Sequence, residues 1–390
     1  MRVVVAFVVA ALALAPHAWA AHPPHLAGYF PQWGLYNGFF VRNVVASGEA
    51  PVLTQIDYAF ANVARNRCAS FDPYADYQAV IGARNSVDGI ADNPQADTLM
   101  GNFHQLSKLK KLFPKIKLVM SIGGGGFAAP FQAAALPANR EAFVASCIDM
   151  YIGGHIAPGV EAPGLFDGFD IDWEYPLASD TANFTALLAE FRRQLDAVRP
   201  GLSLTIAASA DSGNYQNLNL GVIPAYLDFV GVMTYDYNGP WNNFTGFGAP
   251  LYQPPLDPNA ANNVDASVRG FLASGVPPAK IVIGLPFYGY SWFRVPSGEN
   301  GLYQGGAPAN QGLPYWYIQT IEASFPKFHD PVSDASWLYD GRVFWTYDDP
   351  AAIALKMVYA RDHGLGGAMV WELSNDTREA LLLKTAAGAR

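Results

Sequence analysis

The segment from Asp167 to Pro176 carries four carboxylates within eight positions, separated by bulky apolar residues. Successive side chains of a β-strand point to opposite faces, so Asp170, Asp172 and Glu174 would share one face and the apolar residues the other. Asp167 has the opposite parity, and we expect it to turn the backbone where the strand starts. Buried carboxylates stacked on one face repel each other, which raises at least one pKa and suits general acid chemistry. The segment therefore predicts a catalytic strand. A calcium-binding EF-hand loop would need a glycine at its sixth position and irregular backbone.

Short apolar segments with strand character recur along the chain and are mostly separated by segments with helical spacing. Besides the acidic segment, the expected strands are 26–30, 56–61, 117–122, 202–208, 229–234, 281–285 and 367–371. The expected helices are 102–113, 139–153, 181–198, 260–273 and 351–362. Eight such strands alternating with helices predict an α/β fold, a closed parallel (β/α)8 TIM barrel. The residues with chemical potential stand at the C-terminal ends of the strands, where barrel active sites form.

The alternation is interrupted between the seventh strand and the helix that follows it. The segment 293–342 is rich in Gly, Tyr and Trp and contains one possible helix at 317–324. We interpret it as a small α+β insertion subdomain within a barrel that spans residues 21–390. A polar stretch at 62–97 is expected to form a long loop region, and long loops of barrels usually carry function.

The first twenty residues have the features of an export signal. A positively charged start is followed by an apolar run at 3–15 and by a small-x-small cleavage site at Ala18-Trp19-Ala20. We therefore expect a signal peptide at 1–20 and a secreted, extracellular protein that starts near Ala21. No other stretch of the sequence is long and apolar enough to cross a bilayer.

The net charge, the cysteines and the histidines of the sequence limit which partners and metal sites are expected. The net charge of −9 argues against nucleic acid or an anionic membrane surface as a partner. Cys68 and Cys147 can form one disulfide or remain two buried thiols, and the sequence does not decide between them. The seven histidines show no HExxH spacing and no Cys/His cluster, so no metal site and no cofactor are expected. We expect a monomer.

The acidic segment reads as the DxxDxDxE signature, and the chain resembles the family 18 glycoside hydrolases, in particular the bacterial-type chitinases. Other strand ends are similar to motifs of the same family: Gly28-Tyr29-Phe30, Tyr58-Ala59-Phe60-Ala61, Ser121-Ile122-Gly123-Gly124, Met233-Thr234-Tyr235-Asp236 and 366–371. The segment before Trp345 resembles the chitinase insertion domain in a shortened form. The resemblance covers the whole chain after the expected signal peptide.

The resemblance implies catalytic roles for the matching acids. Glu174 would protonate the glycosidic oxygen and then activate water. Asp172 would orient the N-acetyl group of the substrate, and Asp170 would share a proton with Asp172. Tyr29 and Ser121 would hold Asp170 in place.

The resemblance also implies the substrate contacts. Tyr235 would donate a hydrogen bond to the acetamido oxygen, with Asp236 beside the distorted sugar. The cleavage subsite and its leaving side would be lined by Phe60, Met233, Trp241 and Trp371. Gly125 departs from the family pattern, which commonly has a tryptophan directly after the Ser-x-Gly-Gly motif, so a weaker or differently placed distal subsite is expected.

In this family the acetamide of the substrate replaces the second catalytic carboxylate. The resemblance therefore implies hydrolysis of chitin or chitooligosaccharides with retention of configuration. Two alternatives remain open: an endo-β-N-acetylglucosaminidase that cuts N-glycans with the same chemistry, and a chitinase-like lectin. The presence of Glu174 argues against the lectin. Endo or exo action is not specified by the sequence.

Overall fold

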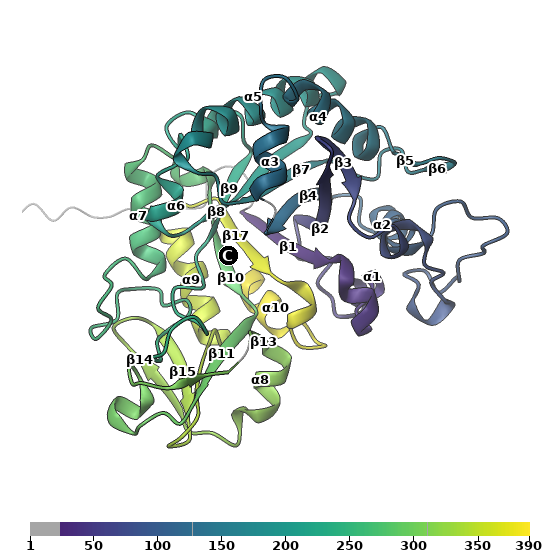
Figure 1. Ribbon diagram of the computed structural model, residues 1–390. Helices are drawn as coiled ribbons and strands as arrows, with labels where there is room; N and C mark the ends of the chain where they lie inside the picture. The colour runs from purple at the N-terminus through teal and green to yellow at the C-terminus, as the bar shows by residue number, and fades with distance from the viewer. Residues whose placement is uncertain (1–23, 127, 310) are drawn as a thin grey trace, which may run out of the picture.

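The computed structural model describes residues 24–126, 128–309 and 311–390 (Figure 1). The expected signal peptide lies outside these residues. In the described part of the chain, eight parallel strands close into a barrel, with each strand paired to the next and the last paired to the first. In chain order they are β1 (His25–Pro31), β2 (Gln55–Ala64), β4 (Lys117–Gly125), β7 (Gly168–Glu174), β8 (Ser203–Ser209), β9 (Phe229–Met233), β10 (Ile281–Pro286) and β17 (Gly367–Trp371). The predicted (β/α)8 barrel is confirmed.

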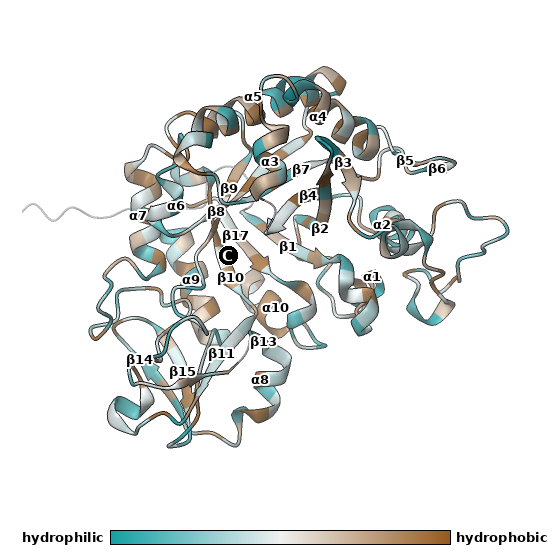
Figure 2. Cartoon of the chain, in the orientation of Figure 1, coloured by the Kyte–Doolittle hydropathy of each residue, from teal (hydrophilic) through white to brown (hydrophobic). Residues whose placement is uncertain are grey.

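Helices surround the barrel, and Figure 2 shows apolar and polar residues alternating along them. They include α1 (Val41–Ala46), α2 (Gly101–Leu112), α4 (Arg140–Cys147), α5 (Thr181–Val198), α7 (Val264–Ala273), α9 (Pro350–Asp362) and α10 (Leu381–Gly388). The helix expected at 139–153 is α4 followed by a π-helical turn, Ile148–Ile152. The helix expected at 260–273 begins only at Val264. Its N-cap is Asn263, whose side chain accepts a hydrogen bond from the amide of Ala266 at 2.8 Å and so fixes the helix start.

The apolar face of β7 determines which way its acids point. Phe169 contacts Phe191 of α5 with ring centroids 5.4 Å apart, and Trp173 contacts Phe184 of the same helix at 5.6 Å. All four rings are buried. Burying a side chain such as Phe169 stabilises the fold by about 1.5–3 kcal/mol. Because this face packs on α5, the acidic face of β7 must point into the barrel.

A second sheet leaves the barrel between β10 and α9, at the predicted place (Figure 1). Its strands are β11 (Tyr288–Phe293), β12 (Ala307–Pro308), β13 (Leu313–Pro314), β14 (Lys327–Asp330), β15 (Ala335–Tyr339) and β16 (Phe344–Tyr347), with helix α8 (Tyr315–Glu322). Strands β11 and β16 extend the sheet beyond the expected bounds 293–342. Helix α8 begins two residues before the helix expected at 317–324. The sheet has its own apolar cluster, which includes Trp292 and Trp337.

A disulfide joins Cys68 to Cys147 across 79 residues of sequence. Cys68 lies on β3 (Arg67–Ser70), which pairs antiparallel with the end of β2, and Cys147 ends α4. Closing a loop of this length stabilises the folded state by on the order of 4 kcal/mol. The choice that the sequence left open is thus resolved in favour of the disulfide. No helix within the described residues is both long and apolar enough to span a membrane.

Candidate active site

Strand register brings the predicted acids together with their neighbours. In the parallel pair of β4 and β7, Ser121 is level with Asp170, and Gly123 is level with Asp172. Gly123 has a φ of 119°, and a Cβ added there would lie 2.1 Å from the carbonyl oxygen of Asp172. Only glycine allows this approach. The glycine at position 123 therefore serves close contact between the backbones of β4 and β7.

Asp170 lies at the centre of a hydrogen-bond network inside the barrel, with only 1% of its surface exposed. The hydroxyl groups of Tyr29 and Ser121 donate to its Oδ2 atom at 2.9 and 2.8 Å. The hydroxyl of Thr205 donates to Oδ1 at 2.8 Å. Burial raises the pKa of Asp170, and these three donors oppose the rise because they favour the ionised form. Thr205 was not predicted from the sequence.

Asp172 lies two residues after Asp170 on the same face of β7, and only 4% of its surface is exposed. Its Oδ1 atom is buried and accepts no hydrogen bond from any of the described residues. Burial raises the pKa of Asp172 well above its usual value, and the negative charges of Glu174 and Asp170 raise it further. At Asp170 three hydrogen-bond donors oppose the rise in pKa, whereas at Asp172 the neighbouring carboxylates add to it.

A further acid, Asp57 of β2, was missed by the sequence analysis. It is 2% exposed, and the side-chain amide of Gln55 donates to its Oδ1 atom at 2.7 Å. Burial and the nearby charge of Asp170 raise the pKa of Asp57 well above its usual value. The alternation of side chains along the strand could have indicated this acid. Gln55 and Asp57 alternate with apolar neighbours and so point into the barrel.

Glu174 ends β7 and faces the open cleft. Burial raises the pKa of Glu174, a hydrogen bond from Tyr175 opposes this, and the negative charge of Asp236 adds to it. A raised pKa keeps the carboxylic acid protonated at a higher pH, which is the state that a general acid needs.

Tyr235 and Asp236 follow β9 and form the opposite side of the site. Asp236 has a left-handed backbone, with φ at 63°. The hydroxyl groups of Tyr288 and Tyr290, both on β11, donate to its Oδ1 atom at 2.6 and 2.8 Å. Burial raises the pKa of Tyr235 well above its usual value. The two tyrosines of β11 were not predicted as site residues, although they alternate along one strand.

The cleft has a volume of about 600 Å³. Its lining includes nearly all of the predicted site, namely Tyr29, Phe60, Asp172, Glu174, Met233, Tyr235, Asp236, Trp241 and Trp371, and also Gly125. Asp170 and Ser121 lie beneath it. The structure thus brings together every residue predicted for the site, while their catalytic roles stay predictions.

Aromatic rings line the cleft and lie beside it. The Trp371 ring stacks on Phe60 at 5.7 Å and contacts Tyr29 edge-on at 5.3 Å. Trp33, which was not predicted, lies 6.2 Å from Trp371 and is 38% exposed. Trp241 of the cleft lining is 59% exposed and lies 5.6 Å from Tyr290. Exposed rings beside an acid-lined cleft offer flat apolar surfaces on which sugar rings can stack.

A comparison with protein families identifies the family of this chain. The model described as glycosyl hydrolases family 18 matches residues 25–376. The chain belongs to this family. The resemblance noted from the sequence motifs is therefore confirmed, and the acidic strand is the signature strand of a family 18 glycoside hydrolase.

Relatives of this family 18 chain include chitinases. Chitinase C of Streptomyces lividans is 36% identical over 365 residues, which cover 90% of this chain and 57% of that protein. Among solved structures, the catalytic domain of the psychrophilic chitinase B from Arthrobacter TAD20 has a TM-score of 0.87 and 31% identity, with 94% of this chain and 95% of that chain covered. A family 18 N-acetylglucosaminidase from Paenibacillus barengoltzii has a TM-score of 0.75 and 29% identity, with 94% and 100% covered. The chain spans about three-fifths of chitinase C and of chitinase A1 of Niallia circulans, at 57% and 61% of their lengths.

Proposed function

We propose that this family 18 chain is a chitinase that hydrolyses β-1,4-linked N-acetylglucosamine polymers with retention of configuration. The observation that carries the proposal is the column of acids on β7, in which Asp172 lies between an anchored Asp170 and a cleft-facing Glu174. Burial and neighbouring charge raise the pKa of Asp172, and its buried Oδ1 atom has no hydrogen-bond partner among the described residues. The chitinase relatives from Streptomyces and Arthrobacter support the substrate class. Export of the protein and a monomeric state remain predictions.

In the proposed first step, Glu174 donates its proton to the glycosidic oxygen, and the bond between this oxygen and the anomeric carbon breaks. The acetamide oxygen of the same sugar forms a new bond to the anomeric carbon, which spreads the positive charge over the acetamide group. Asp172 accepts a hydrogen bond from the acetamide N–H. This role is supported by its buried Oδ1 atom, because an oxygen without a partner is costly until a donor reaches it.

In the second step, the ionised Glu174 takes a proton from water, and the resulting hydroxide forms a bond to the anomeric carbon as the acetamide leaves it. Two displacements on the same carbon give net retention. Asp170 stabilises the column from below through its three hydroxyl donors. Tyr235 would donate to the acetamide oxygen, and Asp236, held by two tyrosines, would contact the sugar ring.

A second candidate uses the same chemistry on other substrates. The Paenibacillus neighbour is described as an N-acetylglucosaminidase, and an endo-acting enzyme on N-glycan cores was left open by the sequence. The exposed Trp241, which lines the cleft, and the exposed Trp33, which lies beside Trp371 of the lining, favour an open cleft that holds several sugars.

The test is a product time course with chitohexaose and with a high-mannose N-glycopeptide, using Glu174→Gln as the inactive control. We expect β-anomeric products of mixed length from chitohexaose within the first minutes. Release of only monosaccharide would indicate an N-acetylglucosaminidase, and cleavage of only the glycopeptide would indicate the N-glycan enzyme. Binding without cleavage of either substrate would contradict hydrolysis altogether.

A further inference from the structure

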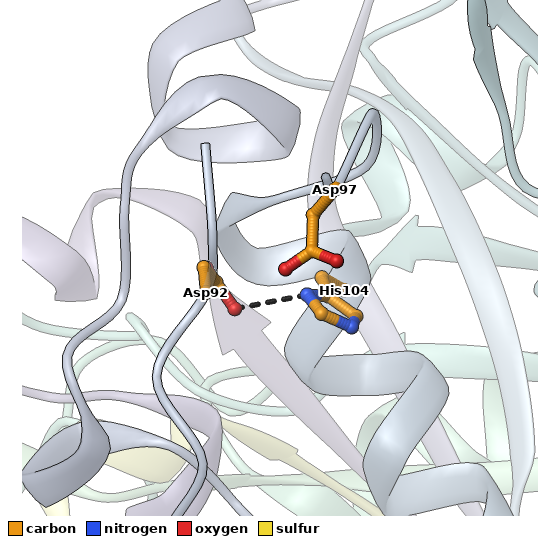
Figure 3. Close-up of side chains that lie close together, drawn as sticks. All are labelled: Asp92, Asp97 and His104. Carbon is orange, nitrogen blue, oxygen red and sulfur yellow. Dashed lines mark hydrogen bonds and ion pairs between the residues drawn. The ribbon is translucent and has the colours of Figure 1, made fainter. Parts of the chain in front are cut away.

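A cluster of potential metal ligands lies far from the acidic strand, where the long loop after β3 meets helix α2. The loop over residues 79–100 contains little regular structure beyond a short 3-10 turn at Ala83–Asn85. Asp92 and Asp97 belong to this loop, and His104 belongs to α2. Figure 3 shows the two carboxylates and the imidazole pointing towards one another.

The three side chains are close enough to share one ion. One ligand atom from each of them lies within 4.8 Å of the other two. Nδ1 of His104 is 2.9 Å from Oδ1 of Asp92. The other oxygen of Asp92 accepts the amide hydrogen of Ile81 at 2.9 Å, and this bond orients the side chain so that Oδ1 faces the imidazole. The carboxylate of Asp92 is fully buried, whereas Asp97 and His104 are half-buried and leave a path from solvent.

The charges at this place are unbalanced. Two carboxylates approach each other, and within the described residues neither forms an ion pair with a lysine or an arginine. The nearest ordered cation on α2 is Lys108, which is already bound by Asp88, Ser86 and the carbonyl of Ile90, each at 2.9 Å. A divalent cation placed between the two carboxylates would balance their negative charges.

We propose that Asp92, Asp97 and His104 bind a divalent transition-metal ion, with Zn²⁺ as the reference ion. One imidazole nitrogen and two carboxylate oxygens are ligands that Zn²⁺ commonly takes, and three protein ligands leave its fourth position for water. Ca²⁺ fits poorly because it needs six to eight oxygen ligands.

The ion would fasten the loop to the helix. Without metal, Asp92 is linked to α2 only by His104 and by the side-chain amide of Gln105, which donates to Oδ1 at 3.2 Å. Metal coordination would add Asp97 to this attachment and close the loop over residues 92–104. The site does not touch the cleft, so its occupancy should affect thermal stability rather than the chemical step.

The test is isothermal titration of the tag-free protein with ZnCl₂, together with thermal unfolding with and without Zn²⁺. We expect one equivalent of Zn²⁺ to bind and to raise the melting temperature, because a ligand that binds only the folded state stabilises it. Asp97→Asn should weaken binding by at least about 100-fold, beyond the usual cost of losing an outer-shell partner, and should abolish the rise in melting temperature.

The matched control is Asp149→Asn. Asp149 also lies beside a histidine, His155, at 2.7 Å, but both side chains of that pair are exposed to solvent. This variant should bind Zn²⁺ like the wild type. The proposal is overturned if the wild type takes up no Zn²⁺, if Asp97→Asn binds as tightly as the wild type, or if Asp149→Asn loses binding equally. Wild-type activity of Asp97→Asn on chitohexaose would show that the variant folds.

Discussion

Two sets of buried carboxylates in this molecule differ in their partners: one forms an ion pair with a lysine, and the other does not. Under the second sheet, Asp348 forms an ion pair with Lys356, and both side chains are buried. Burial raises the pKa of Asp348 and lowers that of Lys356, while the attraction between the two opposes both shifts. Inside the barrel, the described residues form no ion pair with Asp57, Asp170 or Asp172.

This difference distinguishes an acid with a structural role from acids that can exchange a proton during a reaction. A cation fixes the negative charge of its partner, and the pair stays as it is across a wide range of pH. Asp170 is instead held by three hydroxyl groups, and burial raises the pKa of all three barrel acids. A proton can move when charge develops in a substrate, whereas a lysine side chain packed in the core cannot.

The strongest challenge to this contrast is Glu174→Gln. Glutamine keeps the shape of the side chain but cannot donate a proton to a leaving oxygen, so kcat on chitohexaose should fall by about 10²–10⁴-fold. Binding of chitohexaose, measured by titration calorimetry, should change little. Turnover close to that of the wild type would remove Glu174 from the role of general acid.

The structural pair is broken by Lys356→Met, which leaves Asp348 buried without a partner. We expect the free energy of unfolding in urea to drop by about 3–5 kcal/mol, because an uncompensated buried charge is costly. The double variant Asp348→Leu/Lys356→Met should recover most of this loss. A single variant as stable as the wild type would mean that the ion pair does not hold this part of the fold.

The contrast is sharpened by Thr205→Val, which removes one donor from Asp170. Losing a hydrogen bond to an ionised group costs about 1.5–3 kcal/mol. Thr205 favours the ionised form of Asp170, so its removal raises the pKa of Asp170, and the acidic limb of the kcat/KM profile should move to higher pH.

Thr234→Val is the matched control, because Thr234 is equally buried but exchanges its hydrogen bonds with the backbone of Gly284 at 2.8 Å. It should lose stability without moving the pH profile. An equal shift in both variants would show that Thr205 acts through packing alone.

The barrel and the acids of β7 could be predicted from the sequence because both depend on local periodicity. Alternation along β7 placed Asp170, Asp172 and Glu174 on one face, and the packing of Phe169 and Trp173 on α5 explains why that face points inwards. Helix boundaries were less predictable where a single cap decides them. Asn263 starts α7 later than its apolar spacing suggests.

The site residues that the sequence did not predict lie on other strands, and a short stretch of sequence does not show which strands are neighbours in the folded sheet. Asp57 stands two strands away from Asp170 in the barrel, and the order of strands follows only from the closed sheet. Tyr288 and Tyr290 lie where the second sheet leaves the barrel. No local sequence pattern predicts that these two side chains donate hydrogen bonds to Asp236. Asp92, Asp97 and His104 have no regular spacing, so only their position in space reveals the cluster.

The hydrogen bonds from β11 to Asp236 have a consequence for how such enzymes can diversify. An inserted sheet between a barrel strand and its helix could in principle be exchanged between relatives to reshape one wall of the groove. Here the first strand of that sheet also supplies the two hydroxyl groups that orient Asp236. A chimaera that replaces the segment after Phe293 keeps these tyrosines, whereas one spliced directly after Pro286 gives them up, so the workable junction lies inside the inserted sheet and not at its border.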